Sequence, residues 1–384
     1  MLPPAVFDPI RPFEPEELPE AYDRLLADPQ FQTVISYIFP GIPFEALASK
    51  IRLCKTSLEF QKALCYGFLK DLIQKASQGC TMNVSALNTQ HRYTFVSNHR
   101  DIVLDSAFLD VLLIENGFDT TCEIAIGDNL LAAPWIKDLV RINKSFIVER
   151  SAGIREMLAS SKRMSEYMHY VINQKNDNIW IAQREGRAKD SNDRTQQSIL
   201  KMMAMGGEGS IRQRLLSLHI VPLAISYEYD PCDFLKAREF QLKRDQPGWK
   251  KTKQDDVTSM QTGIMGYKGH IHYHCAPCMD AYLEQLDDAM PKGELFETVA
   301  KHIDQEIFRG YQLYPNNYVA ADLLQGNAQF AEHYTSEDRQ RFEAYLQQQL
   351  AKITDIENPD MDFLREKMLY MYANPLFNQK EALP

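Results

Sequence analysis

The chain lacks the hydrophobic segments that direct proteins into or across membranes. Its 384 residues contain no uninterrupted apolar run of about 18 residues, so no membrane-spanning helix is expected. Residues 1–20 are rich in proline and acidic side chains, and they lack the basic start and the apolar stretch of a secretory signal. These absences predict a cytoplasmic protein; if it contacts a membrane, the contact is peripheral and on the inner face.

Three further shortages exclude classes of function. The seven cysteines are scattered and odd in number, which indicates reduced thiols and no disulfide framework. Lys and Arg (42) are outnumbered by Asp and Glu (52), and the net charge of −10 argues against nucleic-acid binding. No Gly-x-Ser-x-Gly sequence is present, which argues against a serine hydrolase of the nucleophile-elbow type.

What the chain does contain, in its central part, is an alternation of two hydrophobic periods. Strand-like runs occur at residues 93–97, 121–126, 145–149, 178–183, 218–227 and 269–275. Between most of them lie segments of helical period, such as residues 154–174. This alternation predicts an α/β fold, a mostly parallel mixed sheet flanked by helices, in a central domain of residues 89–292.

The flanking regions have the apolar spacing of helices. Residues 1–88 are predicted to form an N-terminal helical region, and residues 293–384 a helical C-terminal extension with a break near residues 314–317. A polar segment, residues 234–256, interrupts the central pattern and carries several lysines and arginines. It is interpreted either as a solvated loop or as a patch that attracts anionic lipid headgroups.

Polar clusters directly follow three of the strand-like runs. His99 follows the first run, Arg150 the third, and the cluster of residues 184–189 the fourth. Because the carboxyl ends of parallel strands meet at one edge, where ligands bind, we expect these clusters to lie close together. A histidine can accept a proton at neutral pH, and a carboxylate such as Asp105 can orient its ring.

The basic residues of these clusters predict an anion pocket. Arg150, Arg187 and Lys189 are suited to hold a phosphate, the arginines through forked contacts and the lysine as a point charge. Gly186 would let the backbone approach closely and offer its N–H to a phosphate or an oxyanion. Glu185 is interpreted either as an ion-pair partner of the arginines or as a catalytic group. Solvated surface charge is the alternative for each arginine.

Four segments in this order resemble the sequence blocks of the glycerolipid acyltransferases. They are Asn98-His99 with Asp105, residues 146–150, residues 184–187 and residues 220–228. The arginine after His99 and the Val-Pro…Ile-Ser-Tyr-Glu run are closer to the glycerol-3-phosphate and dihydroxyacetone-phosphate acyltransferase branch than to the lysophosphatidate branch.

The chain departs from that family at two places. Five residues separate His99 from Asp105, where the family has four. Asp105 can still reach His99 if the helix begins one residue later, and Asp101 is the alternative partner. In the third block Arg184 replaces a proline and Arg187 stands one position early, so Lys189 is expected to share the phosphate role.

The resemblance implies an acyl transfer that needs no cofactor or metal, because the thioester is already activated. His99 would deprotonate a hydroxyl of a phosphorylated glycerol, which attacks the thioester of acyl-CoA or an acylated carrier protein. The implied catalytic residues are His99 and Asp105. The implied substrate-binding residues are Asn98, Arg100, Arg150, Glu185, Gly186, Arg187 and Lys189. The implied partners are the donor (possibly on acyl carrier protein), the acceptor and an anionic membrane surface.

Other interpretations of the sequence remain open. The protein is alternatively a lysophosphatidate or other lysolipid acyltransferase, a hydrolase in which His99 activates water, or a non-catalytic lipid-binding protein. His270, His272 and His274 alternate along one strand and precede Cys275 and Cys278. They indicate either a metal site, since imidazole and thiolate suit zinc, or an exposed strand face with buried thiols.

Overall fold

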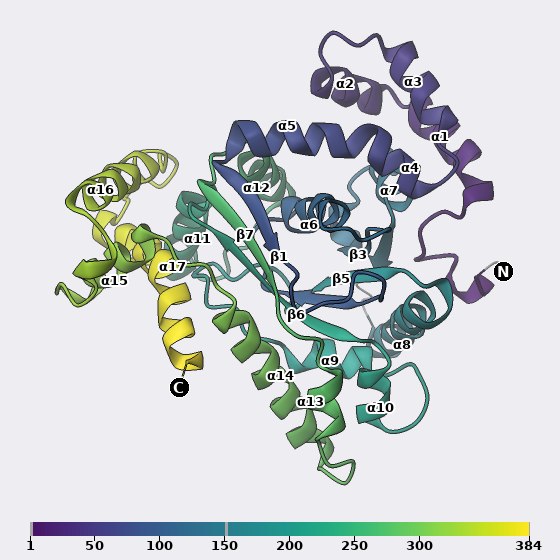
Figure 1. Cartoon of the computed structure of the whole chain (residues 1–384). Coiled ribbons are helices and arrows are strands. Elements are labelled where there is room, and N and C mark those ends of the chain that lie inside the picture. The colour runs from purple at the N-terminus through teal and green to yellow at the C-terminus, as the bar shows by residue number, and fades with distance from the viewer. Residues whose placement is uncertain (1–2, 150–152, 384) are drawn as a thin grey trace.

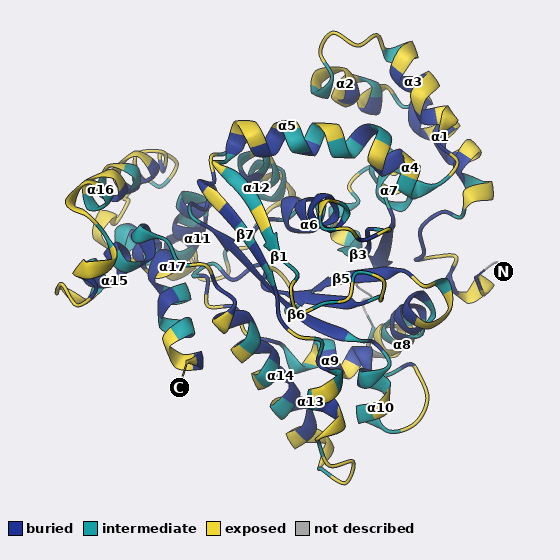
Figure 2. Ribbon diagram, in the orientation of Figure 1, coloured by how far each residue is buried: buried dark blue, intermediate teal, exposed yellow. Residues whose placement is uncertain are grey.

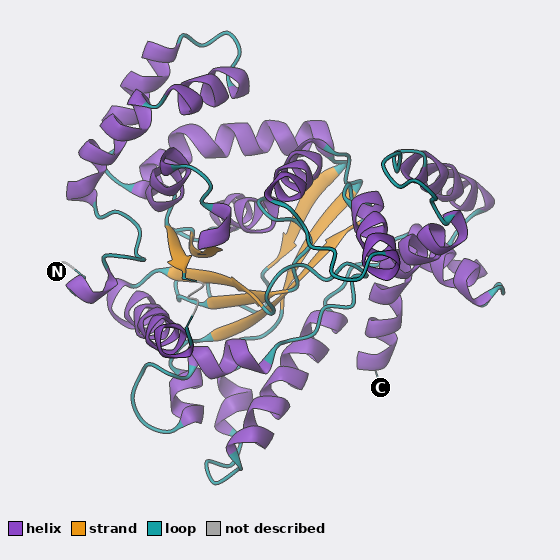
Figure 3. Cartoon of the chain, turned by 180° about the vertical axis from the view of Figure 1, so that it is seen from behind, coloured by secondary structure: helices purple, strands orange, loops and turns teal. Residues whose placement is uncertain are grey.

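A seven-stranded sheet with helices on both faces forms the centre of the molecule (Figures 1 and 3). The computed structural model describes residues 3–149 and 153–383. The strands are β1 (Gly79–Asn83), β2 (Thr94–Ser97), β3 (Cys122–Gly127), β4 (Ser145–Val148), β5 (Asn178–Ala182), β6 (Ile220–Tyr227) and β7 (His270–Cys275). Their order across the sheet is β1-β7-β6-β2-β5-β3-β4.

The direction of the strands confirms the predicted mostly parallel mixed sheet. β6, β2, β5, β3 and β4 run parallel, β7 runs antiparallel to β6, and β1 pairs in parallel with β7. The six predicted strands are all present. β1 was not predicted, because its five residues, Gly-Cys-Thr-Met-Asn, include few of the β-branched and aromatic residues that are enriched in strands.

Helices precede, connect and follow the strands. The N-terminal helices are α1 (Leu18–Ala27), α2 (Pro29–Ile38), α3 (Phe44–Leu53), α4 (Ser57–Phe60) and α5 (Tyr66–Ala76). The connecting helices are α6 (Leu104–Glu115), α7 (Pro134–Ile142), α8 (Ile154–Tyr170), α9 (Gln197–Met203), α10 (Ile211–Leu216), α11 (Asp233–Asp245) and α12 (Lys253–Met265). The C-terminal helices are α13 (Asp280–Glu284), α14 (Lys292–Arg309), α15 (Pro315–Gln325), α16 (Ser336–Leu350) and α17 (Met361–Ala382). In the described part of the chain, none is long and apolar enough to cross a membrane.

Alternate residues of the strands supply the two apolar layers of the core. In β2, Phe95 packs with the side chains of α5 and α6, whereas its neighbour Val96 packs with those of α8 and α14 on the other face. All eight residues of β6 are buried, and the central strands are dark blue in Figure 2. Two covered faces explain why the central strands have nearly continuous apolar sequences.

The polar segment 234–256 is mostly helical, so its interpretation as a loop is wrong. It forms α11 and the start of α12, and five of its seven basic side chains pair with acids on the same or neighbouring elements. The pairs are Lys236–Asp230, Arg238–Asp355, Lys243–Glu239, Arg244–Asp360 and Lys251–Asp256. Much of the positive charge that suggested a headgroup-binding patch is therefore compensated within the protein.

Asp233, at the start of α11, fastens the C-terminal helices to the central domain. Its buried carboxylate accepts hydrogen bonds from the Tyr372 hydroxyl (2.6 Å), the Tyr345 hydroxyl (2.8 Å) and the Gln349 amide (2.6 Å). We expect Asp233→Ala to lower the free energy of unfolding by about 3 kcal/mol, because it leaves buried donors unpaired.

Urea denaturation followed by circular dichroism measures this loss. The matched control is Asp355→Ala, which removes the half-exposed partner of Arg238 and should cost less than about 1 kcal/mol. Equal losses in the two variants would contradict the role given to Asp233.

Candidate active site

His99 lies at the carboxyl edge of the sheet, in the loop between β2 and α6. Its Nδ1 is 2.8 Å from Oδ2 of Asp105, in the first turn of α6. Asp105 is fully buried, and the His99 side chain keeps 14% of its surface exposed. The helix begins at Leu104, after a loop that absorbs the additional residue, and Asp105 thus reaches the imidazole in spite of the longer spacing.

Asp105 is held by several donors besides His99. Its Oδ2 accepts the backbone N–H groups of Arg100 (2.7 Å) and Asp101 (3.0 Å), and its Oδ1 accepts the Tyr227 hydroxyl (3.3 Å). A carboxylate bound in this way fixes the orientation of the imidazole and favours a proton on Nδ1. Nε2 is then the nitrogen that can accept a proton from a substrate.

Asp101 has a different task from Asp105. Its Oδ1 accepts the backbone N–H groups of Val103 and Leu104, both at 2.8 Å, which satisfies free donors at the start of α6. Burial raises the pKa of Asp101, and the nearby Asp105 raises it further. The alternative in which Asp101 partners His99 is therefore wrong in this structure.

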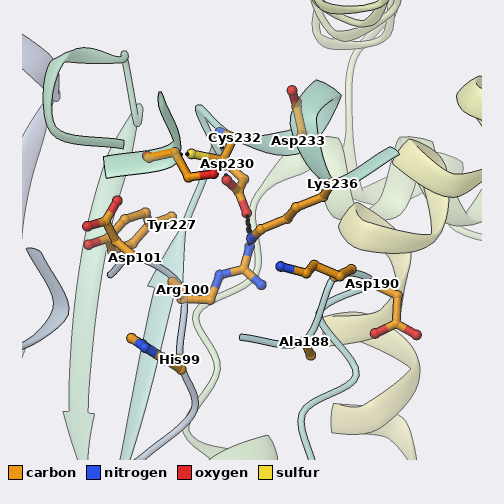
Figure 4. Close-up of polar contacts among 12 residues, drawn as sticks. His99, Arg100, Asp101, Ala188, Asp190, Tyr227, Asp230, Cys232, Asp233 and Lys236 are labelled. Atoms are coloured by element: carbon orange, nitrogen blue, oxygen red, sulfur yellow. Dashed lines mark hydrogen bonds and ion pairs between the residues drawn. The ribbon is translucent and has the colours of Figure 1, made fainter. Parts of the chain in front are cut away.

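Asn98 and Arg100, predicted to bind substrate, are instead engaged within the protein. The Asn98 amide donates to the carbonyl of Ile225 (2.9 Å) and accepts its N–H (2.8 Å), and this fastens the His99 loop to β6. Figure 4 shows Arg100 directed away from His99, toward Asp230 and Lys236. Buried Arg100 lies 3.7 Å from Asp230, which also pairs with Lys236. These contacts could not be predicted, because the sequence does not give side-chain directions.

The third block follows β5 as a turn. Gly186 has a φ of +66°, a backbone conformation that favours glycine, and no neighbouring atom lies within 4 Å of the place a Cβ would take. The turn therefore favours glycine, and the space beside its Cα is not filled by the protein. Glu185 is exposed, and its backbone N–H donates to Gln196 (2.8 Å).

Arg187 and Lys189, in contrast, line a cavity of about 320 Å³ between the third block, α11, α12 and the segment after α16. The other basic side chains lining it, beside Trp249, are Lys236, Arg238, Lys251 and Lys352, and the acidic ones are Glu239, Asp255 and Asp355. Nη1 of buried Arg187 has no hydrogen-bond partner among the described residues. Lys189 pairs with Glu239 at 3.1 Å, and burial together with Arg187 lowers its pKa to about 8. Such a cavity is suited to an anion.

The structure brings the first and third blocks together through Asp193. This buried carboxylate accepts the N–H of Ala188 (3.3 Å) and interacts electrostatically with Arg100, Arg184 and His99. His99 itself is not among the residues that line the cavity. Arg150, the remaining predicted phosphate ligand, lies outside the described residues, and the preceding Glu149 pairs with Arg163 at 2.9 Å.

Two further residues at the site were missed by the sequence analysis. Trp180, in β5, makes an edge-to-face contact with the His99 ring at 5.8 Å, and its indole donates to Ser97. Tyr227, the last residue of β6, donates a hydrogen bond from its hydroxyl to Asp105. Tyr227 belongs to the fourth block, none of whose residues was assigned to the site. No sequence pattern marked Trp180 as a site residue, because a tryptophan within an apolar run is typical of any core strand.

The three histidines of β7 do not share a metal-binding arrangement with the cysteines. His270 binds Glu228 (2.7 Å) and His272 binds Thr81 (2.8 Å), whereas Cys275 is buried in the sheet core. Potential ligand atoms of Cys278 lie within 4.8 Å of those of His219 and Asp280. That group precedes β6 and follows β7, at the edge opposite His99.

Comparison with known proteins fits this geometry. Residues 80–226 match the family model described as Acyltransferase. This segment resembles an acyltransferase domain. It runs from β1 into β6, includes His99, Asp105 and the third block, and covers less than half of the chain.

A solved structure also resembles the chain. It is the 1-acyl-sn-glycerophosphate (LPA) acyltransferase PlsC from Thermotoga maritima, at 11% sequence identity and a TM-score of 0.37, over 74% of this chain and 92% of that one. No curated protein gives a significant match.

Proposed function

We propose that this protein transfers a fatty acyl group from a thioester donor to a hydroxyl of glycerol 3-phosphate or a related phosphorylated glycerol. The observation that carries the proposal is the 2.8 Å contact between Nδ1 of His99 and Oδ2 of Asp105, which is fully buried and accepts several further hydrogen bonds. Both residues lie inside the segment that matches the acyltransferase family model. A cavity lined by six basic and three acidic side chains, Arg187 and Lys189 among them, supports an anionic substrate.

The proposed reaction has one proton and one acyl group to move. His99 Nε2 takes the hydroxyl proton while the acceptor oxygen attacks the thioester carbonyl, and Asp105 stabilises the imidazolium that forms. Collapse of the tetrahedral intermediate breaks the carbon–sulfur bond, and the proton passes from His99 to the leaving thiolate. No covalent acyl-enzyme is required.

The phosphate of the acceptor is proposed to bind Arg187 and Lys189. Arg187 offers an unpartnered buried N–H, and Lys189 adds a second positive charge at the same wall of the cavity. Lysophosphatidate carries the same phosphate, so it is the alternative acceptor. The protein is proposed to bind its donor, acyl-CoA or acylated carrier protein, at the inner face of a membrane.

Identification of the products by mass spectrometry tests the acceptor. Purified protein is incubated with palmitoyl-CoA and glycerol 3-phosphate, dihydroxyacetone phosphate, lysophosphatidate or glycerol, each in turn. We expect acylation of a phosphorylated acceptor and none of glycerol. Equal acylation of glycerol would contradict the phosphate assignment.

The charge of Lys189 gives this assignment a pH dependence. Because its pKa is lowered to about 8, Lys189 loses its charge as the pH rises through that value, and the KM for the acceptor should then increase. Arginine stays charged throughout, so Lys189→Arg should abolish the increase. Initial rates between pH 7 and 9 measure it.

Arg187→Ala should raise the acceptor KM about tenfold at pH 7, equivalent to about 1.4 kcal/mol of binding energy. Arg339→Ala, on the exposed side of α16, is the control. A pH-dependent KM that persists in Lys189→Arg would show that another group titrates.

A further inference from the structure

Three side chains with metal-binding atoms meet where β6 begins, at the edge of the sheet opposite His99. They are His219, which immediately precedes β6, and Cys278 and Asp280, which follow β7. The imidazole, the thiol and the carboxylate each offer one ligand atom, and these atoms lie within 4.8 Å of one another. We call these three residues the His-Cys-Asp group. Among the residues that the structure describes, no other three His, Cys, Asp or Glu side chains meet this limit.

Backbone hydrogen bonds bring the two chain segments of the group together. After β7, the N–H of Ala276 donates to the carbonyl of Pro222 (3.0 Å), and the N–H of Met279 donates to the carbonyl of Ile220 (2.8 Å). Met279 is buried in the core between the cysteine and the aspartate of the group, and Ile220 is the neighbour of His219. The flanking helices α10 and α13 lie side by side (Figure 1). The fold itself therefore fixes where the three side chains begin.

His219 has a backbone conformation that residues other than glycine seldom adopt. Its φ is +46°, in the left-handed region. Hydrogen bonds hold it there from both sides, because its N–H donates to the carbonyl of Leu216 (3.1 Å) and its own carbonyl accepts the N–H of Thr94 (3.1 Å). In this conformation the imidazole lies beside Asp280, with 2.6 Å between Nδ1 and Oδ2.

The carboxylate of Asp280 is incompletely satisfied by the protein. Within the described part of the chain its ion-pair partner is His219, and no lysine or arginine pairs with it. Its second oxygen, Oδ1, is shielded from solvent and has no hydrogen-bond partner among the described residues. A buried polar atom of this kind is costly unless a cation or a water satisfies it. A metal ion between the three side chains would supply the missing positive charge.

The types of ligand atom in the group favour zinc. Imidazole nitrogen, thiolate sulfur and carboxylate oxygen are its ligands in proteins, whereas a thiolate does not suit magnesium or calcium. Bond lengths of about 2.0–2.3 Å place neighbouring ligands of a tetrahedral zinc ion about 3.3–3.8 Å apart, so small side-chain rotations complete the site. The side chains of His219 and Asp280 keep 43% and 33% of their surface exposed, which leaves water access to the fourth position.

We propose that His219, Cys278 and Asp280 bind one zinc ion, with water as the fourth ligand. The ion joins the segment after β7 to the start of β6 and stabilises this end of the sheet. Because it lies at the edge opposite His99, it has no part in the proposed acyl transfer, and the inference does not rest on that function. The sequence grouped Cys278 with the histidines of β7, since the histidine of this site is 61 positions away from Asp280 in the chain.

Cobalt substitution in the full-length protein tests this proposal. The purified chain is freed of metal with a chelator and titrated with Co²⁺. One equivalent should produce the near-ultraviolet charge-transfer band of a cobalt–thiolate bond, together with the intense visible bands of a tetrahedral site. Zn²⁺ binds such ligands more tightly than Co²⁺, so one equivalent of Zn²⁺ should remove both sets of bands.

Variants assign the metal to the His-Cys-Asp group. Cys278→Ser should abolish the charge-transfer band. His219→Gln and Asp280→Asn should each weaken zinc binding about 100-fold, because even the loss of a residue that only orients a ligand costs about 10–100-fold. Competition with a chromophoric chelator measures the affinity, and circular dichroism checks the fold. Cys65→Ser, at another half-buried free cysteine, and His91→Ala, at an exposed histidine, are the matched controls and should bind zinc like the unaltered chain.

Thermal unfolding gives a second measure of the site. Zinc should raise the melting temperature of the unaltered chain and of both controls, but not that of Cys278→Ser, because only a folded state that binds the ion is stabilised by it. If Cys278→Ser does not fold, the zinc affinities of His219→Gln and Asp280→Asn decide the question. Absence of stoichiometric metal binding would overturn the proposal. So would a cobalt–thiolate band that persists in Cys278→Ser, or undiminished zinc binding in the other two variants.

Discussion

His99→Ala should lower kcat about 10³-fold, within the range of about 10²–10⁴ that a positioned general base contributes. The variant should remain folded, because Asp105 keeps its hydrogen bonds from two backbone N–H groups and from Tyr227. Release of CoA thiol with palmitoyl-CoA and glycerol 3-phosphate measures the rate, and thermal unfolding checks the fold.

His91→Ala, on the exposed loop before β2, is the matched histidine control and should retain full activity. The acceptor KM of His99→Ala should change little, because the imidazole acts on the hydroxyl and not on the phosphate. A variant at His99 with more than a tenth of the normal kcat would contradict its role as the base.

Asp105→Asn is expected to lower kcat by a similar factor, about 10³-fold. Oδ2 of Asp105 faces Nδ1 of His99 and two backbone N–H groups. An asparagine amide nitrogen in that place cannot accept a hydrogen bond from any of them. The imidazole would therefore lose both its orientation and the charge that stabilises its protonated form. Steady-state rates should show this loss in kcat, with the acceptor KM nearly unchanged.

Asp101→Asn distinguishes the loss of kcat in Asp105→Asn from damage to the loop between β2 and α6. Asp101 binds the first N–H groups of α6, so its replacement should cost about 1 kcal/mol of stability and leave most of the activity. If Asp101→Asn lost more activity than Asp105→Asn, the assignment of the two carboxylates would be reversed.

Strand positions could be predicted wherever the hydrophobic period was clear. Phe95 and Val96 belong to a run whose period and flanking turns mark a strand, and this run forms β2. β1 was missed because it is a partly exposed edge strand held mainly by its pairing with β7, a contact far away in the sequence. The division into residues 1–88, 89–292 and 293–384 stays a prediction.

The candidate site was predictable only where its contacts are local. His99 and Asp105 lie close in sequence, and their contact follows from where α6 begins. The contacts of Tyr227 with Asp105 and of Arg100 with Asp230 join residues more than a hundred positions apart. Those depend on how the sheet places β6 beside β2, which no local pattern reveals.

Acceptor-dependent thiol release tests the central claim most directly. Purified protein is mixed with palmitoyl-CoA, with and without glycerol 3-phosphate, and free CoA thiol is followed over time beside His99→Ala. The account predicts release that requires the acceptor and nearly vanishes in the variant. Equal release without an acceptor would indicate hydrolysis, and no release with any phosphorylated acceptor and thioester donor would indicate a non-catalytic protein. Either result would contradict the account.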